Sequence, residues 1–153
     1  MPKLSVTKEF TFDAAHFLTD YYGKCERLHG HTYKLQVTIS GDIGPNGLLI
    51  DFVILKAIVK DAVLSDFDHA HLNEIVKNPT SELLAQEIWR RLENLDQLLI
   101  KQIDNQNLCT ELKNYLKDNS LTTENIGENL PQNLKLEAIK LWETPTSFVT
   151  LTR

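Results

Sequence analysis

Polar and apolar residues alternate along four stretches near the two ends of the chain. The first two are residues 3–12 (KLSVTKEFTF) and 31–40 (HTYKLQVTIS), and both are rich in β-branched and aromatic side chains. The last two are LKLEAIKLWE and SFVTLTR, with a short Thr-Pro turn between them. A period of two residues is typical of half-buried strands. We therefore expect four strands, the first two of them antiparallel neighbours.

The middle of the chain has helical periodicity instead. Asp51 stands at an N-cap position ahead of FVILKAIVKDAVL, which predicts a helix over roughly residues 52–64. A second helix is expected from about Ser81 into RRLENL, because it has an acidic residue in its first turn and two arginines near its end. The expected order is strand, strand, helix, helix, strand, strand, which indicates an α+β fold.

Residues 96–131 break this order. The segment is polar, rich in Asn, and only partly helical in its spacing. We interpret it as an insertion with one or two short helices. It contains Cys109, which we interpret as a thiol without a site.

Composition limits the possible functions. With 153 residues, 42% of them hydrophobic, the whole chain, residues 1–153, is expected to form a single domain. A net charge of −5 argues against nucleic acid and membrane surfaces as partners, so an anionic substrate needs a local site. The N-terminal residues lack the apolar core of a signal peptide, and no run approaches the roughly 18 apolar residues of a membrane span. We expect a cytoplasmic protein with free thiols.

Three of the five histidines are placed to meet. His29 and His31 belong to the motif CERLHGH, and in a strand their side chains point to one face about 6.5 Å apart. His16 ends FDAAH, after the first predicted strand, and comes close to them if the two strands pair. Three imidazoles without a fourth protein ligand would make a catalytic zinc site with one open position. Two exposed histidines at the start of a strand would give the same His-x-His pattern.

Two further features can each be interpreted in two ways. The thiolate of Cys25 is either a fourth ligand that closes the metal site or a general base beside the metal. Asp68 and His69, in FDHAH, are either a proton relay or a capping carboxylate next to a surface histidine.

Six motifs taken together resemble a known family. In chain order they are FDAAH, CERLHGH, GLLIDF, FDH, NPTSE and WET, and the resemblance covers about residues 4–95 and 134–152. They resemble the 6-pyruvoyl-tetrahydropterin synthase and 6-carboxytetrahydropterin synthase family. The resemblance implies a tunnelling fold (T-fold), with a four-stranded antiparallel sheet and two helices on one face. It also implies a homohexamer of two stacked trimers with active sites at subunit interfaces.

The same resemblance assigns the metal site. His16, His29 and His31 match the zinc ligands, and Cys25 matches the catalytic thiol that moves protons on the substrate side chain. Zinc on the side-chain oxygens would acidify the neighbouring C–H and stabilise the enediolate.

Other residues of the active site follow from the resemblance as well. Asp68 and His69 match a second catalytic pair that an adjacent subunit supplies. Glu143 matches the carboxylate that binds the pterin ring, and Thr80 and Ser81 match the segment at the ring's other edge. A carboxylate can accept two hydrogen bonds, from the pterin's amino group and from a ring N–H.

The spacing before the His-Gly-His motif separates the activities within the family. Cys25 precedes His29 by three intervening residues, which resembles the 6-carboxytetrahydropterin synthases of queuosine and deazapurine synthesis rather than the Cys-x5-His pyruvoyl enzymes. These lyases convert 7,8-dihydroneopterin triphosphate to 6-carboxy-5,6,7,8-tetrahydropterin, with release of acetaldehyde and triphosphate.

Glu26 complicates this assignment. It has the Glu-x2-His-Gly-His spacing of a group that forms 6-hydroxymethyl-dihydropterin for folate synthesis. It is either a solvated loop carboxylate or part of a bifunctional enzyme. The sequence is also compatible with a pyruvoyl-type synthase, a non-catalytic pterin-binding protein or a simple zinc-binding module.

Overall fold

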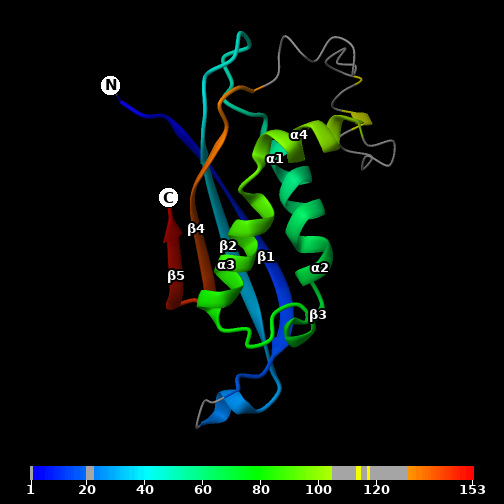
Figure 1. Ribbon diagram of the computed structural model, residues 1–153, viewed down its shortest axis with the longest axis vertical. Helices are drawn as coiled ribbons and strands as arrows, with labels where there is room; N and C mark the ends of the chain where they lie inside the picture. Colours follow the sequence, from blue (N-terminus) through cyan, green and yellow to red (C-terminus); the bar gives the residue numbers. More distant parts are fainter. Residues whose placement is uncertain (1, 20–22, 105–112, 115–116, 118–130) are drawn as a thin grey trace.

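The computed structural model describes residues 2–19, 23–104, 113–114, 117 and 131–153, and these contain one mixed sheet covered on one face by helices (Figure 1). The described part of the sheet has five strands in the order β3-β1-β2-β4-β5. Their bounds are β1 Ser5–His16, β2 His29–Ser40, β3 Ala70–His71, β4 Lys135–Thr144 and β5 Ser147–Thr152. The four long strands are antiparallel, as expected.

The first two strands are longer than the sequence predicted. They pair without interruption from Ser5 opposite Ser40 to His16 opposite His29. The predicted limits, 3–12 and 31–40, left out residues 13–16 and 29–30, but the backbone ladder continues through both segments. This extension places His16 and His29 within paired strands.

The strand β3 adds to the four that were predicted. Its two residues pair parallel to β1, with Ala70 beside Ala14 and His71 beside Ala15. Two residues are too few to produce a recognisable period, so the sequence pattern could not reveal them.

The predicted helices are present with adjusted limits. The first is α1 Phe52–Val59, capped by the Asp51 carboxylate, which accepts a hydrogen bond from the Val53 N–H at 2.7 Å. It continues through a π-helical turn, Lys60–Leu64, into α2 Ser65–Phe67. The helix α3 spans Ser81–Leu92, and the Thr80 hydroxyl accepts from the Leu83 N–H at 3.2 Å.

The predicted insertion begins with a helix, α4 Leu95–Asp104. Leu95, Leu99 and Ile103 are buried in the core, so this helix is packed against the rest of the fold. Most of the remaining insertion, including Cys109, lies outside the described residues. Within the described residues, no helix is long and apolar enough to span a bilayer.

The core lies between the sheet and the helices. Along β2, Tyr33, Leu35, Val37 and Ile39 are fully buried, and they alternate with polar residues on the opposite face. By the same alternation, His29 and His31 lie on the helix-covered face, beyond the apolar end of the core. The fold thus places histidines at one end of a rigid sheet.

Candidate metal centre and substrate pocket

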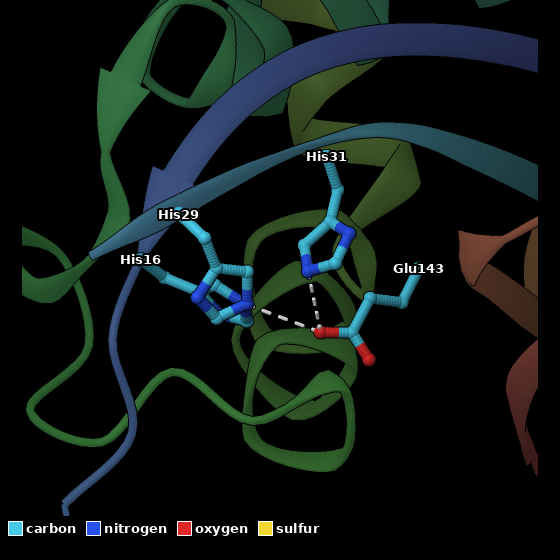
Figure 2. Close-up of side chains that lie close together, drawn as sticks. All are labelled: His16, His29, His31 and Glu143. Carbon is cyan, nitrogen blue, oxygen red and sulfur yellow. Dashed lines mark hydrogen bonds and ion pairs between the residues drawn. The ribbon is translucent and has the colours of Figure 1, made fainter. Parts of the chain in front are cut away.

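Four side chains converge at this end of the sheet, as Figure 2 shows. His16 ends β1, His29 and His31 begin β2, and Glu143 lies near the end of β4. One potential ligand atom of each lies within 4.8 Å of those of the other three. His16 is fully buried, and the other three are partly buried.

Backbone carbonyl groups fix the orientation of two imidazoles. His16 Nδ1 donates to the Pro79 carbonyl at 2.8 Å, and His29 Nδ1 donates to the Arg27 carbonyl at 2.7 Å. Because a carbonyl oxygen only accepts, each Nδ1 carries the proton and each neutral ring has a lone pair on Nε2. These two Nε2 atoms are 3.1 Å apart. Such carbonyl-anchored histidines with converging lone pairs are typical of metal ligands.

His31 completes a set of donors that suits a metal ion. Its Nε2 atom is buried and has no hydrogen-bond partner among the residues that the structure describes, although it lies 3.1 Å from Glu143 Oε1 in a geometry that is not a hydrogen bond. The same carboxylate oxygen lies 3.1 Å from His16 Nε2. Ligand atoms around tetrahedral zinc are about 3.3 Å apart for bonds of about 2.0–2.1 Å. Three of the donor pairs are 3.1 Å apart and all four donor atoms lie within 4.8 Å of one another, so three imidazoles and a carboxylate can converge on a divalent metal such as zinc.

The charges of the cluster are coupled. The contact with His16 Nε2, 3.1 Å away, holds the pKa of Glu143 below its usual range; burial opposes this effect, and the nearby His31 adds to it. Burial lowers the pKa of His31, and the carboxylate offsets this only in part. For His16, burial opposes the charged form, but the contact with the Glu143 carboxylate and the hydrogen bond to the Pro79 carbonyl outweigh it and raise the pKa. Glu143 is thus ionised at neutral pH.

Cys25 lies near the cluster in sequence but is not part of it. It occupies a 3₁₀ turn, Lys24–Glu26, where its carbonyl accepts from the Leu18 N–H at 2.8 Å. The thiol is free and partly exposed, and its sulfur is not among the four converging ligand atoms. Glu26 follows in the same turn and is exposed.

Asp68 and His69 form a pair outside the cluster. The Asp68 Oδ1 atom lies 3.0 Å from His69 Nδ1 and accepts from the Asp13 N–H at 3.1 Å. That backbone hydrogen bond is the main reason why the pKa of Asp68 lies below its ordinary value. Side chains adjacent in sequence usually diverge, but His69 has a φ of 59°, and its N–H donates to the Asp13 carbonyl at 2.6 Å. The His69 side chain remains 79% exposed, so the pair faces outward.

A pocket of about 400 Å³ adjoins the cluster at Glu143. Thr80 and Ser81, at the start of α3, line it together with Glu143 and with Phe148 of β5. The Ser81 hydroxyl donates to Glu143 Oε2 at 3.3 Å. The structure therefore brings together the three residues that the resemblance assigned to the pterin ring. It places them next to the three histidines.

Sequence reasoning missed the contact of Glu143 with the histidines. We expected this carboxylate only at the substrate ring, yet one of its oxygens lies among the imidazoles. It also missed His71, whose Nε2 is buried without a hydrogen-bond partner in the described part of the chain and whose ring lies 5.8 Å from that of Phe17. No sequence signal marks either contact, because both depend on how distant strands pack.

Comparison with known proteins agrees with this architecture. Residues 5–97 match the family model described as 6-pyruvoyl tetrahydropterin synthase. The chain is 36% identical over 147 residues to a 6-carboxy-5,6,7,8-tetrahydropterin synthase of Haemophilus influenzae, with 94% of each chain covered. It is also 32% identical over 141 residues to a dihydroneopterin monophosphate aldolase of Pyrococcus furiosus, covering 92% of this chain and 90% of the relative.

A solved structure supports the fold. The 6-pyruvoyl tetrahydropterin synthase of Caenorhabditis elegans superimposes with a TM-score of 0.65 at 23% identity, covering 100% of this chain and 97% of that one. The predicted T-fold is thereby confirmed, with the short β3 as an addition to the predicted sheet. Together with the matched family model and the relatives above 30% identity, this shows that the chain belongs to the 6-pyruvoyl tetrahydropterin synthase family.

Proposed function

We propose that the protein is a zinc-dependent 6-carboxytetrahydropterin synthase. The reaction converts 7,8-dihydroneopterin triphosphate to 6-carboxy-5,6,7,8-tetrahydropterin and releases acetaldehyde and triphosphate. The observation that carries the proposal is the position of three converging imidazoles beside a pocket lined by Glu143, Thr80 and Ser81. The relative from Haemophilus influenzae, which bears the name of this enzyme, supports the choice of product. The queuosine and deazapurine pathway is part of the proposal.

His16, His29 and His31 would hold the metal. Their donor atoms and carbonyl-anchored rings suit zinc, which would supply Lewis-acid polarisation of the substrate's side-chain oxygens. The two backbone carbonyls keep the rings in one tautomer. The ligands are thus preorganised for metal binding.

Glu143 would recognise the pterin ring. Its lowered pKa keeps the carboxylate ionised, and a carboxylate accepts two parallel hydrogen bonds from an amino group and an adjacent ring N–H. The Ser81 hydroxyl, which touches Oε2, orients this carboxylate toward the pocket. Thr80 lines the same pocket, although its hydroxyl also caps α3.

Proton transfer would fall to Cys25 and to the pair formed by Asp68 and His69. The free, partly exposed Cys25 lies in a turn between the strands that carry the histidines, four residues before His29. The outward-facing His69 suits a site in a neighbouring subunit better than the cluster of its own chain. We therefore include a homohexamer of two trimers, with active sites between subunits, in the proposal.

A second function has a specific observation in its favour. Glu26 lies next to Cys25 at the spacing of the side-chain-cleaving enzymes, and one relative is named dihydroneopterin monophosphate aldolase. Under this second function the protein also forms 6-hydroxymethyl-dihydropterin. We put the single-function synthase first, because the spacing of Cys25 before His29 and the relative from Haemophilus influenzae both favour it.

Product identification tests the proposal. Purified, zinc-loaded protein is incubated with 7,8-dihydroneopterin triphosphate, and the pterins are identified by mass spectrometry, with Cys25→Ala as the matched control. We expect 6-carboxytetrahydropterin and acetaldehyde from the wild type only. A 6-hydroxymethyl product would favour the second function. Pterin binding without turnover would show a non-catalytic member of the family and contradict the proposal.

A further inference from the structure

Glu143 stands between the metal cluster and the substrate pocket, and each of its two oxygens faces one of them. We propose that Glu143 is a fourth, displaceable metal ligand in the substrate-free protein and that it leaves the metal when a pterin ring enters the pocket. The inference rests on the metal site and the ring pocket of the proposed function. It adds a resting state in which protein atoms occupy all four positions.

The first argument is the placement of Oε1. This atom lies 3.1 Å from His16 Nε2 and 3.1 Å from His31 Nε2, close to the roughly 3.3 Å edge of a tetrahedral zinc site. Figure 2 shows the carboxylate directed at the imidazoles. Carboxylate oxygens are ordinary zinc ligands, at about 2.0–2.2 Å. Glu143, rather than Cys25, therefore holds the position of the fourth ligand.

The second argument is the local backbone. The pairing of β4 with β5 changes register between Trp142 and Thr144, so Glu143 is the extra residue of a β-bulge. The last β4 residue paired with β2 is Trp142, which leaves Glu143 beyond that ladder too. Bulges re-aim side chains and loosen pairing, and they are frequent next to active sites. Glu143 is consequently freer to change its direction than a residue within the ladder.

The third argument is that the two roles compete for the same carboxylate. The side chain is 27% exposed, and among the described residues its Oε2 atom receives a long hydrogen bond of 3.3 Å from Ser81 Oγ. A pterin ring held by two parallel hydrogen bonds uses both carboxylate oxygens, whereas a metal bound to Oε1 takes one of its lone pairs and part of its negative charge. Ring binding therefore weakens the bond between Glu143 and the metal, and metal binding weakens the hydrogen bonds to the ring.

This competition predicts a measurable coupling between the metal and the ring. A plain pterin has no side-chain oxygens to replace Glu143, so it has to compete with the metal for the carboxylate. By linkage, pterin should then lower the metal affinity by the same factor by which the metal lowers the pterin affinity, on the order of tenfold.

Cobalt(II), which reports its coordination in its visible spectrum, provides the test. Glu143→Gln and Glu143→Ala are compared with wild type, with Glu82→Gln, which changes a carboxylate lining the same pocket, and with Cys25→Ala. We expect an altered cobalt spectrum in both Glu143 variants only. We also expect zinc affinity, measured by chelator competition, to fall by more than roughly 100-fold, the upper end of the loss for a group that only hydrogen-bonds to a ligand. Added pterin should change the wild-type spectrum and leave that of Glu143→Gln unchanged.

The outcomes separate this inference from the proposed function. Identical cobalt spectra and zinc affinities in wild type and both Glu143 variants would overturn the inference, while turnover by wild type would leave the enzyme assignment intact. A change of equal size in Cys25→Ala would overturn it as well, since the thiol would then be the fourth ligand. Wild-type protein that binds neither cobalt nor zinc would refute the metal site, and with it both proposals.

Discussion

His16 and His29 face each other across the β1–β2 ladder, and their Nε2 atoms are 3.1 Å apart. Both rings donate their Nδ1 protons to backbone carbonyls, so in the neutral state two lone pairs point at each other. This contact is repulsive unless a proton or a metal ion lies between the two atoms. The fold therefore holds two ligands in an arrangement that a cation stabilises.

The first prediction concerns the metal content. Replacing His29 by Ala removes one donor of the cluster, so zinc affinity should fall by more than roughly 100-fold, the upper end of the loss for a group that only supports a ligand. Cys25→Ala should retain its zinc, because the sulfur is not among the converging atoms. Metal analysis of both purified variants, with circular dichroism to verify folding, checks this. Equal loss of zinc in the two variants would make Cys25 a structural ligand.

The second prediction concerns the exposed pair. If Asp68 and His69 act in a neighbouring subunit, an assembly that mixes Cys25→Ala and His69→Ala chains contains some active sites with both groups intact. Random mixing of equal amounts gives about one quarter of such sites, so about one quarter of wild-type activity should return. Each variant alone should be inactive. Mixed assemblies detected by native mass spectrometry but without activity would contradict a shared site.

The third prediction concerns stability at low pH. Hydrogen bonds from Arg90 and Arg91, and their charges, lower the pKa of Glu87 from 4.5 to about 2. Because the folded-state pKa is depressed, this carboxylate stabilises the protein above pH 4.5 and loses that contribution as the pH falls toward 2. Glu87→Gln should therefore lower the free energy of unfolding by on the order of 1 kcal/mol at pH 7, and by progressively less below pH 4.5.

Urea unfolding at several pH values measures this difference. Glu93→Gln is a suitable control, because Glu93 is exposed just after α3 and forms no ion pair among the described residues. A gap between wild type and Glu87→Gln that stays constant from pH 7 to the most acidic measurement would show that the charge of Glu87 is not its cause.

The three histidines could be foreseen because their meeting depends on local rules. Alternation along a strand puts His29 and His31 on one face, and antiparallel pairing of two consecutive strands brings His16 to the same end. The strands and the capped helices followed from periods and N-cap residues in the same way. Each of these features depends on a few consecutive residues or on neighbouring segments of the chain, so the sequence pattern predicts it.

Other features depend on contacts between distant segments. Glu143 reaches the imidazoles through its place in β4 and the bulge beside it, and neither depends on a period of hydrophobic residues. The pairing of Asp68 with His69 needs a left-handed backbone at His69 that the neighbouring β1 stabilises through Asp13. The resemblance to a family predicted that these residues belong to the site. Only the structure revealed how they are arranged.

The last prediction concerns Cys25 and Glu26, which share one 3₁₀ turn before the His-Gly-His motif. If Cys25 is the base for the carboxy product, Cys25→Ala should lower its rate by about 10²- to 10⁴-fold while the protein stays folded and zinc-loaded. Glu26→Gln preserves the shape of the side chain but cannot exchange a proton near neutral pH. We expect this variant to keep the wild-type rate of 6-carboxytetrahydropterin formation.

Mass spectrometry of the pterin products distinguishes the two roles. A bystander Glu26 predicts a single carboxy product from wild type and from Glu26→Gln, and none from Cys25→Ala. A catalytic Glu26 predicts that Cys25→Ala still releases 6-hydroxymethyl-dihydropterin and that Glu26→Gln loses that compound alone. We expect the first pattern, because a carboxylate beside a cationic metal site has an electrostatic reason to be there without carrying a proton.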